Sequence, residues 1–122
     1  MRTILSTAAI AAALVVGTPP QAGADAFRAV TDRSQFVSLV SGRTLSYPGV
    51  RLQVTTDGQI SGRGLGIKVT GAWQWQGDYF CRDLYWGDRE LGANCQQVLA
   101  NGDTLRFISD RGTGQQADLR LR

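Results

Sequence analysis

The sequence predicts an all-β protein, a small antiparallel meander of six to eight short strands with one short N-terminal helix and one disulfide. Two observations predict it. Apolar and polar residues alternate along most of the chain after Thr44, as they do in half-buried strands. The segments between them are short and rich in Gly, which leaves no room for the long crossovers that parallel strands need. Whether the strands form a barrel or a two-layer sandwich stays open.

Residues 1–24 are predicted to be a cleaved secretory signal peptide, and residues 25–122 a single β domain. Arg2 supplies the initial positive charge, an apolar stretch runs from Ile4 to Val16, and small residues precede Asp25. The apolar stretch is shorter than the roughly 20 residues that a transmembrane helix needs. We therefore expect a periplasmic or secreted protein without a membrane anchor after cleavage.

Composition and charge argue against several kinds of site. The chain of 122 residues has 13 Lys and Arg, 10 Asp and Glu, and no His. Without His there is no His-based triad, His general base or His metal ligand. The cations alternate with acids along the chain and form no block, so we do not expect nucleic-acid binding. We expect no cofactor and no metal.

One helix is predicted at the start of the domain. Thr31 or Asp32 can cap its first turn, and Gly42 stands where a helix-ending glycine belongs. Apolar residues between them recur at the spacing of one helical face, at Phe36, Leu39 and Val40. A helix of about ten residues is unstable alone, so this face must dock on the strands.

Alternation of apolar and polar residues, together with turn motifs, predicts how the remaining chain divides into strands. The alternating segments are 50–55, 65–75, 79–86, 95–99, 105–107 and 117–121. Asp57-Gly58 and Asn101-Gly102 predict tight hairpin turns. Gly71 leaves open whether 65–75 is one strand or two. The triplet Gly62, Gly64 and Gly66 lacks the spacing of a dinucleotide-binding loop and predicts a bulge or a tight barrel corner.

Cys81 and Cys95 are the only two cysteines, and we expect them to form a disulfide. Thirteen residues separate them, which is not the spacing of a redox-active pair. They are symmetric about Asp88, so they can face each other across a hairpin with its tip at Gly87–Glu90. A disulfide also fits an oxidising compartment.

Arg82 and Asp83 are candidate binding residues. As neighbours in a strand they point to opposite faces, and the residues beside each are largely apolar. One charge must therefore face the interior, where it is either paired internally or holds a ligand at the barrel mouth. The sequence does not decide which of the two faces inward.

The other candidates lie around the disulfide hairpin. Its tip, residues 87–94, has Trp86 at its base and contains Arg89, and both are residue types that dominate binding hot spots. Six aromatic residues within fourteen positions fit either a core or an aromatic binding patch: Trp73, Trp75, Tyr79, Phe80, Tyr85 and Trp86. We expect a non-enzymatic module that binds an unknown protein or a small ligand in the periplasm. The alternative is a small hydrolase that uses carboxylates near Asp83 and Asp88.

A sequence pattern spans most of the domain, with W-x-W at 73–75, F-C-R at 80–82, N-C-Q at 94–96 and L-R-F at 105–107. With it the chain resembles a group of short exported bacterial proteins, some of which are labelled dihydrodipicolinate reductase. That enzyme has a dinucleotide fingerprint and a second domain, which this sequence lacks, so the resemblance implies no catalytic residue. The layout is also loosely similar to small periplasmic barrels that inhibit lysozyme.

Overall fold

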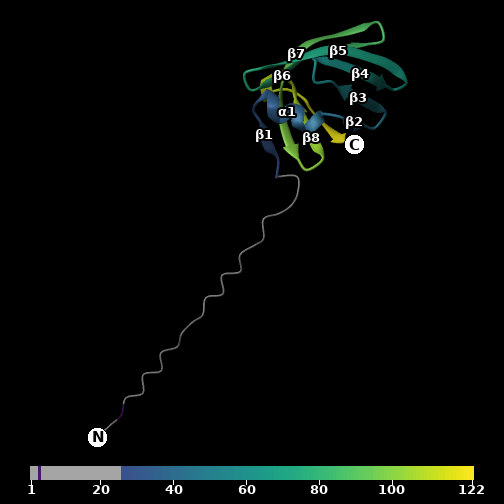
Figure 1. The fold of residues 1–122 in the computed structure, drawn as a ribbon. Coiled ribbons are helices and arrows are strands. Elements are labelled where there is room, and N and C mark those ends of the chain that lie inside the picture. The colour runs from purple at the N-terminus through teal and green to yellow at the C-terminus, as the bar shows by residue number, and fades with distance from the viewer. Residues whose placement is uncertain (1–2, 4–25) are drawn as a thin grey trace.

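The computed structural model describes Thr3 and residues 26–122, so the predicted signal peptide, apart from Thr3, lies outside the described residues (Figure 1). The described residues form two helices, α1 (Arg33–Val40) and α2 (Ser109–Gly112). The strands are β1 (Arg28–Val30), β2 (Thr44–Tyr47), β3 (Val50–Val54), β4 (Gln59–Gly64), β5 (Ile67–Gln76), β6 (Tyr79–Trp86), β7 (Arg89–Asn101), β8 (Thr104–Ile108) and β9 (Gln116–Leu121). No helix among the described residues is long and apolar enough to cross a membrane.

Strands β2 to β9 form a closed antiparallel barrel, so the barrel and not the sandwich is the architecture. Each strand pairs with the next along the chain, and β9 returns to pair with β2, with Leu45 opposite Leu121. The C-terminus accordingly lies beside β2 (Figure 1). Strand β1, which the sequence analysis did not anticipate, pairs with the second half of β7. The long β7 therefore bonds to β6, β8 and β1.

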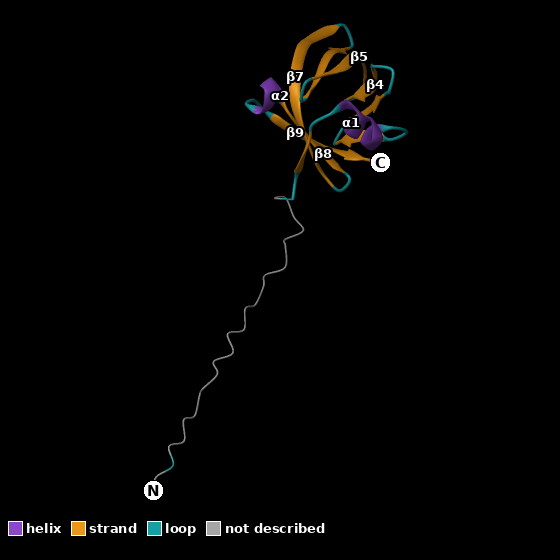
Figure 2. Cartoon of the chain, turned by 60° about the vertical axis from the view of Figure 1, so that its left-hand side comes forward, coloured by secondary structure: helices purple, strands orange, loops and turns teal. Residues whose placement is uncertain are grey.

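The turns of a meander alternate between the two ends of its barrel. At one end, which we call the helix end, lie the turns β3–β4, β5–β6 and β7–β8, together with α1. The Arg33 guanidinium donates to the Thr56 carbonyl there, at 2.6 Å. At the other, the open end, lie the turns β2–β3, β4–β5 and β6–β7 and the α2 segment. Figure 2 shows α1 and α2 apart from each other on the barrel.

Helix α1 has the caps that the sequence predicts. The Asp32 carboxylate accepts from the Gln35 amide at 2.8 Å, and this hydrogen bond lowers the pKa of Asp32. Gly42, with φ of +70°, follows the C-cap Ser41. Phe36 and Val40 are completely buried, so the helix closes its end of the barrel with its apolar face.

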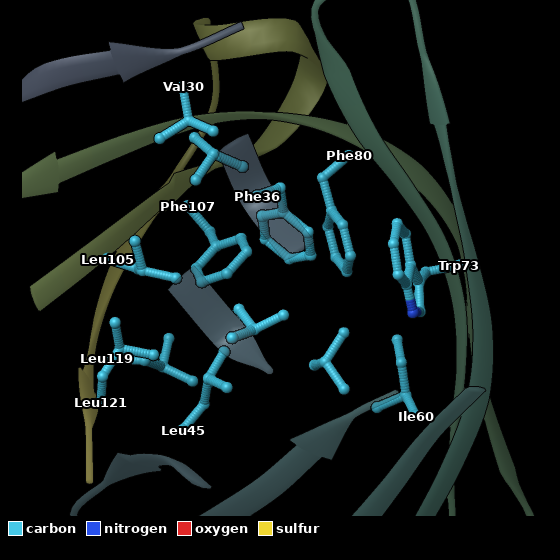
Figure 3. Close-up of a cluster of buried hydrophobic side chains, with 13 residues drawn as sticks. Val30, Phe36, Leu45, Ile60, Trp73, Phe80, Leu105, Phe107, Leu119 and Leu121 are labelled. Carbon is cyan, nitrogen blue, oxygen red and sulfur yellow. The ribbon is translucent and has the colours of Figure 1, made fainter. Parts of the chain in front are cut away.

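The core fills the helix end of the barrel. The Phe36 ring lies at its centre, between Phe80, Phe107 and Trp73 (Figure 3), with ring centroids 4.9–6.4 Å apart. Around these rings pack aliphatic side chains from α1 and from most of the strands: Val30, Val40, Leu45, Val54, Ile60, Val98, Leu105, Leu119 and Leu121.

Several strand boundaries differ from the sequence-based expectation. β5 is one continuous strand, in which a Cβ at Gly71 would overlap the Asp83 carbonyl oxygen of β6. The β7–β8 turn is Gly102-Asp103, one residue later than expected. The stretch 89–94, expected as a loop, belongs to β7, and the hairpin tip is only Gly87-Asp88. A register shift after Leu84 accommodates one extra residue in β7, and such bulges leave little trace in an alternation pattern.

The disulfide prediction is confirmed. Cys81 of β6 lies directly opposite Cys95 of β7, and the two are bonded. No bulge occurs within β4 at the glycine triplet, because β4 pairs with β3 and β5 in continuous register, but the triplet does allow a close approach of two strands. Gly62 has φ of +148°, and a Cβ there would overlap the Arg51 carbonyl oxygen of β3. The backbones of β3 and β4 thus approach closely only because position 62 has no side chain.

Candidate functional site

The barrel contains a cavity of about 290 Å³. Its floor and walls consist of apolar side chains contributed by β2, β3, β4, β6, β8 and β9. These are Leu45, Leu52, Val54, Ile60, Phe80, Leu84, Phe107 and Leu119. The core rings Phe80 and Phe107 therefore separate the cavity from Phe36 of α1.

The rim of the cavity, toward the open end, is polar. It consists of Arg82 and Gln96 from neighbouring strands, Ser109 of α2, and Gln115 and Gln116 at the start of β9. Gln96 is buried and donates its Nε2–H to Ser109 Oγ at 3.2 Å. The cavity thus combines an apolar floor with a set of hydrogen-bonding groups at its rim. Small-molecule binding sites usually have this combination.

Arg82 faces the barrel interior, which settles the choice between Arg82 and Asp83. It shares its face of β6 with Phe80 and Leu84 and lies opposite Trp73 and Asn94. Its Nη1 donates to the Gly92 carbonyl oxygen at 2.7 Å, so the guanidinium extends along β7 toward the open end.

Burial acts on the charge of Arg82. It lowers the pKa of the guanidinium, and the nearby Asp83 carboxylate offsets part of that effect. An arginine nevertheless stays protonated at neutral pH. The ion pairs among the described residues join Arg43 to Asp103 and Arg106 to Asp118. Arg82 therefore brings a half-buried cation to the cavity without a carboxylate bonded to it there.

The α2 segment is fastened to β7 at this rim. The Asn94 side chain donates to Asp110 Oδ1 at 2.8 Å and accepts from the Asp110 amide at 3.0 Å. Asp110 and Arg111 both have φ of 55°, a left-handed conformation that costs about 1–2 kcal/mol per residue for L-amino acids. The two Asn94 bonds hold this conformation and so fix the position of Ser109 at the rim.

Asp83 lies on the outside of the barrel. It lines a groove of about 340 Å³ with Ala72, Ala93 and the disulfide, and its Oδ1 is buried without a hydrogen-bond partner. Asp88 is exposed in the β6–β7 turn and does not line this groove. The structure therefore does not bring together the two carboxylates that a hydrolase would need.

Trp86 and Arg89 lie at the open end, opposite each other across the β6–β7 hairpin. The Trp86 indole is half-buried and donates to the Gly64 carbonyl oxygen at 2.8 Å, while Arg89 is exposed. Of the six aromatic residues between positions 73 and 86, some belong to the core and others are exposed, so neither the core nor the binding patch accounts for all of them. Trp73 and Phe80 belong to the core, whereas Tyr85 is exposed.

Apart from Arg82, the residues of the polar rim were not predicted from the sequence. Gln96 shares its parity with Val98, which marks an inward position within β7 once that strand is known to begin at Arg89. Ser109, Gln115 and Gln116 carry no such signal because they lie in or beside an irregular segment. Comparison with family models, curated proteins and solved structures finds no match for this chain.

Proposed function

We propose that this protein is a non-enzymatic binding protein whose barrel holds a small amphipathic anion, a carboxylate with an apolar tail. The observation that carries the proposal is the position of Arg82, a half-buried cation at the rim of an apolar cavity. Charge-assisted hydrogen bonds are about twice as strong as neutral ones, and a guanidinium matches a carboxylate in bidentate fashion. An apolar tail would fill the floor between Leu52 and Ile60.

The volume of the cavity limits the size of the ligand. A water molecule takes about 30 Å³ of liquid, so 290 Å³ accommodates on the order of ten non-hydrogen atoms. This corresponds to a carboxylate with roughly six to ten carbons. A longer tail would have to displace Phe80 or Phe107, which pack against Phe36.

Titration calorimetry with three ligands of equal tail length tests the proposal. We expect octanoate to bind with one-to-one stoichiometry, and roughly 10–100-fold more tightly than octan-1-ol, because a hydrogen bond to a charged group contributes about 1.5–3 kcal/mol. Octylammonium should bind most weakly, since Arg82 repels it. Arg82→Gln should abolish the preference for octanoate over octan-1-ol.

The matched control is Arg28→Gln, which removes an exposed cation of β1 and should leave that preference intact. Equal binding of octanoate and octan-1-ol would refute the proposal, and so would an unchanged preference in Arg82→Gln. A role of Arg82 only in holding the Gly92 carbonyl of β7 would lower the melting temperature of Arg82→Gln without changing the ratio of the two affinities.

A further inference from the structure

The exposed apolar side chains are concentrated at one end of the barrel. The large hydrophobic residues that the described chain exposes are Tyr47, Leu65, Ile67, Tyr85 and Leu91. All five lie within three residues of the open-end turns β2–β3, β4–β5 and β6–β7. The turns of the helix end hold none of these side chains and contain Asp57, Asp78 and Asp103, whereas the three open-end turns contain one acid, Asp88. We call the five exposed apolar side chains the tip surface.

Hydrogen bonds between the hairpins make the tip surface one unit. The Leu65 amide donates to the Gly49 carbonyl oxygen of the β2–β3 turn at 2.7 Å. The Gly87 amide of the β6–β7 turn donates to the Lys68 carbonyl oxygen, also at 2.7 Å. The three hairpin tips are therefore fixed relative to one another before any partner arrives, and such preorganisation favours affinity.

Leu65 is the most exposed member and the least suited to its position. Its side chain is 73% exposed, and its φ is +51°. This left-handed conformation disfavours a side chain, and glycine adopts it freely. Backbone strain of this kind at an exposed position indicates a function for the side chain.

Three cations, Lys68, Arg63 and Arg51, lie beside these tips. A row of directly opposed residues crosses five neighbouring strands, in the order Lys68, Arg63, Arg51, Ser46 and Arg120. Like charges on adjacent strands, about 4.8 Å apart, destabilise a sheet. None of these four cations forms an ion pair among the described residues. Arg63 instead donates to the Gly66 carbonyl oxygen at 3.1 Å, beside Leu65.

From these features we propose that the open end of the barrel docks on an anionic lipid bilayer. Leu65, Ile67 and Tyr47 enter the interface, and Arg51, Arg63 and Lys68 contact the anionic headgroups. Peripheral membrane binding combines apolar insertion with electrostatic attraction in this way. A soluble polyanion would use the cationic row but would gain nothing from a strained, exposed leucine, which is why the bilayer is favoured.

The docking surface is separate from the cavity, so the inference does not rest on the proposed ligand. Docked in this way, however, the protein would present its cavity rim toward the lipid, because both lie at the open end. An amphipathic anion could then pass between the bilayer and the barrel without crossing water.

Co-sedimentation of the purified protein with lipid vesicles tests the inference. We expect binding to vesicles of equimolar phosphatidylcholine and phosphatidylglycerol and little binding to phosphatidylcholine alone, with attraction falling at high salt. Leu65→Gly should weaken partitioning by about tenfold. Arg51→Gln and Arg63→Gln should each weaken it by about fivefold, while Arg28→Gln on β1 should leave it unchanged.

Leu65→Gly separates docking from folding, because glycine suits position 65 and should not lower the melting temperature. No binding to anionic vesicles would refute the inference, as would equal binding by Leu65→Gly and the unaltered protein. Binding to a soluble sulfated polysaccharide, combined with vesicle binding that does not depend on Leu65, would assign the cationic row to a polyanion and likewise overturn the membrane proposal.

Discussion

Removing the Phe36 side chain should lower the free energy of unfolding of the barrel by a large fraction of its total. The residue is 0% exposed, and its ring lies 5.2 Å from Trp73, 5.4 Å from Trp75, 4.9 Å from Phe80 and 6.4 Å from Phe107. A buried Phe→Ala change costs about 3–5 kcal/mol, since it loses apolar burial and leaves a cavity. A domain of this size has about 5–15 kcal/mol of stability in total.

Thermal and urea denaturation of Phe36→Ala, followed by near-UV circular dichroism, measures this cost. Each kcal/mol shifts the melting temperature of a domain this small by about 4–8 °C, so we expect a fall of about 15–30 °C. Phe36→Leu keeps most of the volume and should cost less than about 1.5 kcal/mol. A decrease in melting temperature of less than about 5 °C in Phe36→Ala would contradict this, because it would show that the core is stable without the Phe36 ring of α1.

Three further predictions follow from the fold. Gly71→Ala should destabilise the protein by more than about 2 kcal/mol because its Cβ would overlap the β6 backbone, whereas Gly64→Ala, whose Cβ has ordinary contacts, should cost less than about 1 kcal/mol in urea denaturation. Replacing Cys81 and Cys95 by Ala should cost about 3 kcal/mol, the entropy of a loop of about 15 residues, and an unchanged urea midpoint would contradict this. The arginine partner of Asp118 lowers its pKa, so the pair stabilises the fold above about pH 4 and this contribution is lost as pH falls below that value. Asp118→Asn should therefore lower the melting temperature at pH 7 but not at pH 2, and an equal effect at both would exclude the ion pair as its cause.

Local signals sufficed to predict the helix, the disulfide and most strands. Asp32 as a cap, Gly42 as a terminator and the spacing of Phe36 act within one or two turns of chain, where sequence and structure are tightly coupled. The opposition of Cys81 and Cys95 likewise depends on a single hairpin. Barrel closure has no such signal, because β2 and β9 pair residues as distant as Leu45 and Leu121.

The candidate site depended on the same distant information. Both faces of β6 are apolar beside the charges, so only the complete barrel decides that Arg82 faces inward. Arg51, Arg63 and Lys68 are scattered in the sequence and become neighbours once the register of three strands is known. The order of charges along the sequence therefore does not reveal the cationic row, which appears only when residues are compared across paired strands.

Closure by the final strand has a consequence for how the chain is made. Synthesis proceeds from the N-terminus, and β2 is among the first barrel strands to appear, yet its second neighbour is β9. Until β9 is available, the nascent protein is an open sheet with unpaired edges on β2 and β8, and such edges recruit other chains. The mutual Thr44 and Arg122 backbone hydrogen bonds, both 2.9 Å, join the first residue of β2 to the residue that follows β9. Protection from edge-to-edge association therefore begins only once β9 has been synthesised and has paired with β2.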